Sequence, residues 1–507
     1  MAEMVEKDAA TRQIEILKIE ETSAPKYAGD DELVDKSGNI RRIPIASTDP
    51  NDPLNFSKWR KLGVLICCCW FSIFSLVLVG GLGPSLPVFI ELYAPQGHSV
   101  ESIFNLTTYP SSVMAGAIGA AKCNSYGTKM VCRILQGFAT GAIESVLPLI
   151  ISDMTFLDER GFFFSIYWGS QNTINAVFLI SISYLVAATS WRWFYWLLTI
   201  LGGFGTIMGV LLLAETRYQR SPMSLNGQIV HTDEFGVTSV LSDAEAVQRF
   251  GTQNETNENS PPSAQKIYLQ HLKLFQGTAL NPGRVEAGAF YKMILSCSSP
   301  AVVWAILSSS ISPGIEIAMS LTYGTVLEKL FHWSPASVGL INVGMLRASV
   351  ISTLWAGLIG EKINLWLARR RKGTHIPKDS LIILIIPSII SAIGIVVFAA
   401  AAMLPQKHSS WGLSWVSWTL FEFGFIVILI TTTHFAAPGP ALVGVIGMKY
   451  IISFGASYGI TLMVSKFNYL QAFMILFAIF TLIFVLGIPV YILNPKWRAY
   501  IGKKHKN

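Results

Sequence analysis

The sequence predicts an all-α polytopic membrane protein with a two-bundle architecture and about ten full membrane spans. Of its 507 residues, 51% are hydrophobic and only 14% are charged, whereas soluble domains carry about 25% charged residues. The apolar residues form long uncharged blocks, for example at 62–82, 380–406 and 469–495. Each block is long enough for the helix of roughly 20 residues that a bilayer requires.

Basic residues indicate which helix ends face the cytoplasm, because Lys and Arg are retained on that side. They precede the first apolar block, fill the loop at 361–379 and follow the last block at 496–506. We therefore expect both termini and this loop in the cytoplasm. The formal net charge of +7 is confined to such clusters, so it orients helices and does not indicate a nucleic-acid partner.

The polar segments divide the chain into two helical bundles. We expect a largely disordered cytoplasmic tail at 1–60, a truncated first bundle at 61–214, a cytoplasmic linker at 215–298, a six-helix second bundle at 299–494 and a basic tail at 495–507. The predicted spans are 62–86, 130–152, 162–187 and 192–214, then 300–327, 336–360, 380–404, 411–434, 442–464 and 470–493. Both bundles contain an even number of spans, which keeps the linker and the termini on one side.

The segment 103–121 does not fit as a complete span. It is rich in Asn, Thr, Ser, Gly and Ala, and a fifth crossing would place the linker on the wrong side. We interpret it as a partial segment that enters from outside. The polar junction KCNSYGTK at 122–129 then lies near the outer side despite its two lysines. The sequon that begins at Asn105 would also face outside, where it is a candidate for glycosylation.

Several short motifs follow one another in the order of a known family. They are GLGPSLP at 81–87, RILQGFATGAIES from Arg133, DERG at 158–161, WRWFYW from Trp191, AETRY from Ala214 and the basic loop GEKINLWLARRRKG at 360–373. This order resembles the major facilitator superfamily, specifically fungal drug:proton-antiporter-type carriers with twelve spans, over most of residues 52–500. The resemblance implies two bundles that rock about a central site. It says little about the substrate.

The chain also departs from this family. The resemblance implies a second span, a loop and a third span where this chain has only the junction, so roughly 30–40 residues are missing. SQNTINAVFLIS at 170–181 stands in place of the family's antiporter motif, and HFAAPGPALVG at 434–444 is a short loop. Two interpretations therefore remain open. The chain is either a working carrier, or a transport-inactive truncated paralogue or gene-model artefact of one.

Ionisable side chains inside a bilayer cost roughly 2.5–3.5 kcal/mol each by insertion scales, so each needs a reason. Arg133 and Glu144 are eleven residues apart, which places them within about 20° on one helix face, with Gln136 beside Arg133. We expect this stripe to line a substrate and proton pathway. The alternative is a structural pair that bridges to other helices. The resemblance implies that RILQG serves proton coupling and packing.

A second polar face is predicted on the following span. Trp168, Gln171, Asn172 and Asn175 share one side of a helix, where three amides and an aromatic ring could contact a polar organic ligand. Hydrogen bonding between helices is an equally good interpretation.

The second bundle also contains ionisable residues inside apolar blocks. Glu422 lies in the middle of its span, and we expect it to face the central cavity. Glu316 lies in another apolar block. Lys449 and, less easily, Arg347 can extend along the helix to the bilayer surface.

These observations favour a proton-coupled secondary transporter of a small organic solute over an enzyme. The expected substrate is a drug, a secondary metabolite or a polyamine-like cation, moved by an efflux antiporter that works by alternating access. The eight His are scattered without an HxxxH pair, and no GxSxG, phosphate loop or CxxC is present. We expect no cofactor and no metal, protons as the coupling ion, and a monomeric glycoprotein of the plasma membrane, with the vacuolar membrane as the alternative.

Overall fold

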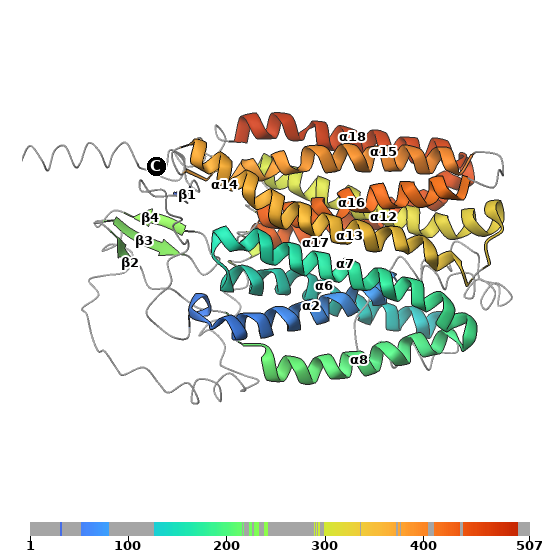
Figure 1. The fold of residues 1–507 in the computed structure, drawn as a ribbon, viewed down its shortest axis with the longest axis horizontal. Coiled ribbons are helices and arrows are strands. Elements are labelled where there is room, and N and C mark those ends of the chain that lie inside the picture. Colours follow the sequence, from blue (N-terminus) through green and yellow to red (C-terminus); the bar gives the residue numbers. More distant parts are fainter. Residues whose placement is uncertain are drawn as a thin grey trace, which may run out of the picture.

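The computed structural model of the chain describes residues 31–32, 52–80, 126–214, 216, 223–225, 228–232, 238–241, 288, 290–291, 293–294, 299–334, 336–371, 374–375, 377–403, 410–436 and 440–494. Within these ranges, long helices lie side by side along one direction (Figure 1). The predicted partial segment at 103–121, Asn105, and GLGPSLP at 81–87 lie outside them.

The first half contributes four helices, which are α2 (Lys58–Gly80), α6 (Tyr126–Met154), α7 (Leu157–Ala188) and α8 (Trp191–Leu212). Each lies on one of the four predicted spans. The start of α6 at Tyr126 places the second half of the polar junction 122–129 in its first helical turn. A short 3-10 turn at Pro53–Asn55 precedes α2.

The second half contributes α12 (Pro300–Phe331), α13 (Val343–Leu354), α14 (Gly360–Arg370), α15 (Ile385–Ala401), α16 (Ser410–Ala436), α17 (Pro440–Lys466) and α18 (Tyr469–Val485). A π-helical turn at Trp355–Ile359 joins α13 to α14, and 3-10 turns at Val338–Asn342 and Pro377–Leu384 lead into α13 and α15. Six helical rods therefore occupy the six predicted spans. The predicted all-α fold class is confirmed.

Short strands lie beyond the helices, at the end where α14 finishes (Figure 1). β1 (Asp31–Glu32) pairs antiparallel with β5 (Thr374–His375). β2 (Met223–Leu225), β3 (Gln228–Thr232) and β4 (Thr238–Leu241) form an antiparallel sheet in the order β2-β3-β4. The sequence analysis did not predict these strands.

Seven helical segments of the described residues are long and apolar enough to cross a membrane. α6, α7 and α17 are not among them, and they carry Glu144, Gln171 and Lys449. All three of these side chains are buried in the interior of the described structure.

The two halves meet along α6 and α7. α7 packs against α13 and α16, and α6 packs against α17, while α2, α7 and α8 contact one another within the first half. In the second half α12 packs on α16 and α17, and α15 packs on α16 and α18. α6, α7, α13, α16 and α17 therefore form the surface on which any site shared by the two halves must be built.

Small residues allow the backbones to approach closely where α7 crosses the second half. Gly169 faces Thr353, and Gly357 faces Ser165. A β-carbon on Gly339 would lie 2.6 Å from the Ser183 hydroxyl oxygen and 2.9 Å from the carbonyl oxygen of residue 179. The contact therefore runs along much of α7, from residue 165 to residue 183.

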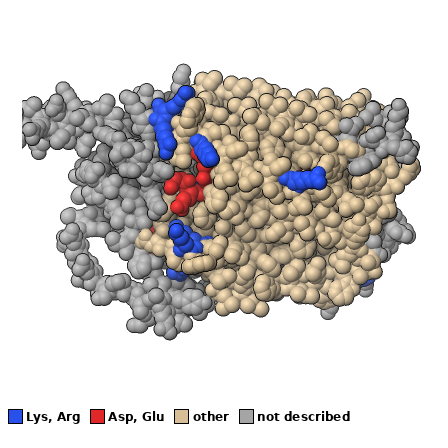
Figure 2. All heavy atoms as spheres, viewed as in Figure 1, with Lys and Arg blue, Asp and Glu red and all other residues tan. Residues whose placement is uncertain are grey.

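Charged side chains gather at one end of the visible face, and the broad remainder is almost free of them (Figure 2). At that end the backbone N–H of Phe162 donates to Glu361 Oε1 at 2.6 Å, which ties the start of α7 to α14. Arg371 and Asp379 form an ion pair at 2.6 Å. Partial burial opposes the charge on Arg371, but the bond to Asp379 outweighs it and the pKa of the guanidinium is raised. This basic end is the one predicted to face the cytoplasm.

We expect Gly339→Ala to lower the thermal stability of the full-length protein in detergent by about 1–3 kcal/mol, because the added methyl group overpacks a backbone contact. Gly203→Ala is the matched control, since a β-carbon there meets nothing within 4 Å. Equal melting temperatures for the two variants would show that α7 and the turn at 338–342 are not closely packed.

Candidate functional site between the two helical bundles

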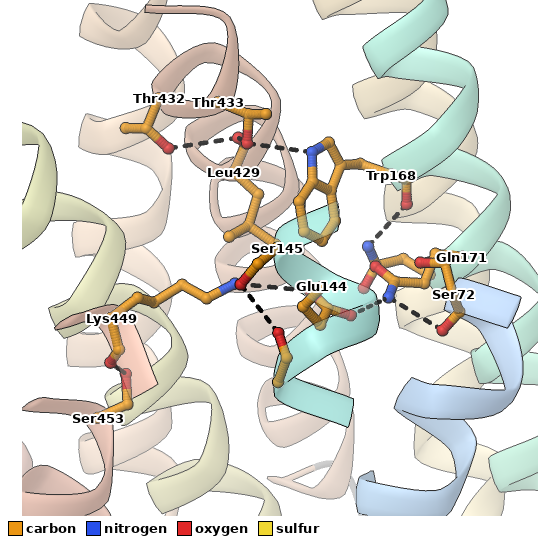
Figure 3. A network of polar contacts seen from close by, with 12 residues as sticks. Ser72, Glu144, Ser145, Trp168, Gln171, Leu429, Thr432, Thr433, Lys449 and Ser453 are labelled. Atoms are coloured by element: carbon orange, nitrogen blue, oxygen red, sulfur yellow. Dashed lines mark hydrogen bonds and ion pairs between the residues drawn. The ribbon is translucent and has the colours of Figure 1, made fainter. Parts of the chain in front are cut away.

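A buried ion pair joins the two halves of the molecule. Lys449 Nζ on α17 lies 3.8 Å from Glu144 Oε2 on α6, and the two residues are 4% and 2% exposed. Figure 3 shows the lysine side chain extending from its own helix toward the carboxylate. The interpretation that Lys449 extends to the bilayer surface is therefore wrong, because an opposite charge is available inside the protein.

Gln171 fixes the carboxylate from the other side. Its amide nitrogen donates to Glu144 Oε1 at 2.8 Å and to the backbone carbonyl oxygen of Ser72 at 3.1 Å. α2, α6 and α7 thus hold Glu144 in place together (Figure 3). One carboxylate oxygen faces an amide of its own half, and the other faces the lysine of the opposite half.

Trp168 makes a second link between the halves. Its indole N–H donates to Thr433 Oγ1 on α16 at 3.1 Å. Lys449 Nζ lies 5.1 Å from the Trp168 ring centroid and 4.5 Å from that of Tyr450, so the ammonium has aromatic faces beside it as well as a carboxylate. Ser453, one turn after Lys449, donates to the carbonyl oxygen of Ser310 at 2.8 Å and ties α17 to α12.

This arrangement can respond to protons and to charged ligands. Removing the charge of one partner from a buried pair leaves the other charge uncompensated, which is far more costly than the intact pair. A proton on Glu144, or an anionic group that competes for Lys449, would therefore weaken the direct attraction between α6 and α17. A change at one carboxylate would then alter how tightly the two halves hold together.

The structure places the predicted polar face of α7 in the interior. Trp168, Gln171, Asn172 and Asn175 are each at most 3% exposed. Gln171 reaches Glu144, whereas the Asn172 amide donates to the Trp168 carbonyl oxygen of its own helix. Asn175 Oδ1 has no hydrogen-bond partner among the described residues. On this face, Gln171 and Asn172 therefore donate hydrogen bonds within the protein, whereas Asn175 Oδ1 could still accept one from a ligand.

The other predicted positions lie elsewhere. Arg133 and Gln136 belong to α6, but their side chains are outside the described part of the structure. Glu422 on α16 is fully buried and does not join the network around Glu144. Arg347 is exposed, and its guanidinium lies 5.1 Å from the Trp415 ring centroid.

Lys449 and Thr433 were not predicted as site residues. A usable signal for Lys449 existed in the sequence, because a lone lysine in one apolar span and a lone carboxylate in another balance each other's charge. Thr433 gave no such signal. Among the described residues, no group of three His, Cys, Asp or Glu side chains could hold a metal ion.

Comparison with known proteins gives a consistent result. The sequence profile of the Major Facilitator Superfamily matches residues 104–460. The chain is similar to an uncharacterised MFS-type transporter, C1271.10c, of Schizosaccharomyces pombe, at 22% identity over 480 residues that cover 84% of this chain and 81% of the relative. It is also similar to the MFS-type transporter atr4 of Stereocaulon alpinum (23% over 410 residues, 76% of this chain and 67% of the relative). The efflux pump FUBT of Fusarium oxysporum is 23% identical over 367 residues, which cover 72% of this chain and 54% of the pump.

The ion pair predicts a strongly non-additive pair of substitutions. We expect Glu144→Gln and Lys449→Met each to destabilise the full-length protein by about 3–5 kcal/mol, because each leaves a buried charge without its partner. The double variant should lose much less than the sum of the two. Thermal unfolding of the four proteins in the same detergent measures this coupling, and additive losses would contradict a direct pair.

Proposed function

We propose that this chain, which belongs to the Major Facilitator Superfamily, carries a small organic solute across its membrane in exchange for protons. The family and the relatives named as transporters make the chain a secondary transporter and not an enzyme. The exchange of protons is carried by one observation, the buried Glu144–Lys449 pair between the two halves. A carboxylate at this position can hold a proton in one state and a cation in the other.

Proton binding would act through the contact between α6 and α17. Protonated Glu144 has no charge to hold Lys449, so the two halves lose one attraction and the equilibrium shifts toward a state in which they separate at this point. Deprotonation restores the pair. Coupling follows if solute and proton each prefer a different one of these two states.

The wall around the pair supports an organic solute that carries polar groups. Trp168 presents a ring beside Lys449, and Asn175 Oδ1 is buried without a hydrogen-bond partner among the described residues. A drug, a secondary metabolite or a polyamine-like cation has the ring-contacting and hydrogen-bonding groups that such a wall accepts. We propose export across the plasma membrane, which the efflux pump among the relatives favours.

We expect Glu144→Gln to abolish pH-dependent transport while leaving membrane insertion intact, because the amide has the same shape and cannot take up a proton. Proteoliposomes with an internal pH dye, tested with a panel of organic cations and neutral drugs, measure solute-driven proton flux. Glu159→Gln is the matched control, since Glu159 lies in the first turn of α7, outside the network. Unchanged pH dependence in Glu144→Gln would remove Glu144 from the mechanism.

The short polar junction at 122–129 favours a second candidate, a truncated carrier that no longer transports. Sequencing the messenger RNA across codons 119–125 separates the two. A message with about 30–40 extra in-frame codons there would describe an ordinary twelve-span carrier. A message that reads straight through AAKCNSYG would establish the short chain, and we then expect transport to be weak or lost.

A further inference from the structure

A second group of buried polar side chains lies within the second half, apart from the Glu144–Lys449 pair. Glu422 on α16 is fully buried, and neither of its carboxylate oxygens has a hydrogen-bond partner among the described residues. Trp418, one turn earlier, is 1% exposed and its indole N–H also lacks an acceptor there. Asn342 Oδ1 is likewise buried without a hydrogen-bond partner among the described residues. Buried polar groups are nearly always paired, so three such groups in one region need an explanation.

These groups surround one tyrosine on α12. The rings of Tyr323 and Trp418 have centroids 5.3 Å apart at an interplanar angle of 68°. The Tyr323 hydroxyl accepts a 3.5 Å contact from Asn342 Nδ2. Glu316 lies two helical turns before Tyr323 on the same face of α12, and Glu422 lies one turn after Trp418 on α16. α12, α16 and the turn at 338–342 thus bring two carboxylates, two aromatic rings and one amide together.

Among the described residues, no cation is paired with this group. No described Lys or Arg forms an ion pair with Glu316 or Glu422, and Lys449 is already paired with Glu144. Two neighbouring carboxylates without a counter-charge are costly at this depth. Glu316 is only partly buried, whereas Glu422 is fully buried.

We propose that Glu316, Glu422, Tyr323, Trp418 and Asn342 form a binding site for an organic ammonium ion that also carries a hydrogen-bond acceptor. This inference rests on the proposed transport function and names the class of its solute. The ammonium group would donate to the two carboxylates and to Asn342 Oδ1, which are all acceptors in need of a donor. Its apolar body would lie against the two rings, which favour a cation at their faces.

The unpaired donor of the site separates this ligand from a bare metal ion. The Trp418 N–H can only donate, so a cation without an acceptor would leave it unpaired. A hydroxyl, ether or carbonyl group on the ligand satisfies it. An anion or a neutral hydrocarbon fits worse still, because neither carries the positive charge that would balance two carboxylates.

Tyramine and 4-ethylphenol test the proposal directly. Both carry the same phenol, but only tyramine adds an ammonium group. We expect tyramine to bind the purified full-length protein in detergent and raise its melting temperature with concentration, while 4-ethylphenol has no comparable effect. Equal effects of the two compounds, or none from tyramine, would overturn the proposal.

The variants locate the binding. Glu422→Gln should weaken tyramine binding by about ten- to hundred-fold, the cost of one lost charge-assisted hydrogen bond. Trp418→Phe keeps the ring and removes only the donor, so it should weaken binding less and provides a second measurement if Glu422→Gln does not fold. Full affinity in both folded variants would show that tyramine binds elsewhere.

A different variant keeps this inference separate from the proposed proton exchange. Glu144→Gln should abolish pH-dependent transport and still bind tyramine with wild-type affinity, because the two groups of residues share no member. Loss of tyramine binding in Glu144→Gln would show that tyramine binding depends on Glu144, and it would overturn the proposal of a separate site. Normal proton-coupled transport of other solutes, with no tyramine binding, would overturn only the ammonium site.

Discussion

The ion pair between Glu144 and Lys449 is the contact on which the interior of the molecule depends. Neither charge could remain in a low-dielectric interior alone, so α6 and α17 must bring the two side chains together. Gln171 and Ser72 then orient the carboxylate from α7 and α2. Trp168 covers the ammonium group and bonds to α16. Helices from both halves are thereby organised around one pair of opposite charges.

Around this polar centre the two halves are held by contacts of another kind. Toward one end, Gly339 lies so close to Ser183 that even an added methyl group would force a local shift. Toward the other, Gly357 meets Ser165, and the Phe162 N–H donates to Glu361. If the two halves separate at one end, the contacts at that end must break, and the contacts at the other end can serve as the pivot. Close backbone contacts at both ends and a charge pair between them suit a protein that alternates between two arrangements.

The sequence predicted what depends on hydropathy and helical periodicity, and it missed what depends on which helices become neighbours. The spans were predicted because twenty apolar residues have few other uses, and Gln171 was expected on a polar face from its spacing alone. Lys449 stood out as a lysine within an apolar block, but the sequence alone did not decide whether Glu144, Glu316 or Glu422 lay opposite it. Tyr323 and Trp418 gave no signal at all, since aromatic residues carry no penalty in a membrane. The strands at 223–241 were missed because they are short and lie in a segment of mixed composition.

The two buried glutamates, Glu144 and Glu422, differ in the partners that the protein gives them. Glu144 accepts a hydrogen bond from Gln171 on Oε1 and has the Lys449 ammonium 3.8 Å from Oε2, so the protein itself balances its charge, and a change in that charge would act on the contact between the two halves. Glu422 has neither, and the groups around it are also unpaired within the described residues. A carboxylate whose charge the protein balances can hold a structure together and respond to protons, whereas one without a counter-charge gains most from a cationic ligand. On the two proposals together, proton uptake and the binding of an ammonium solute depend on two different carboxylates, one that links the halves and one that lies within the second half.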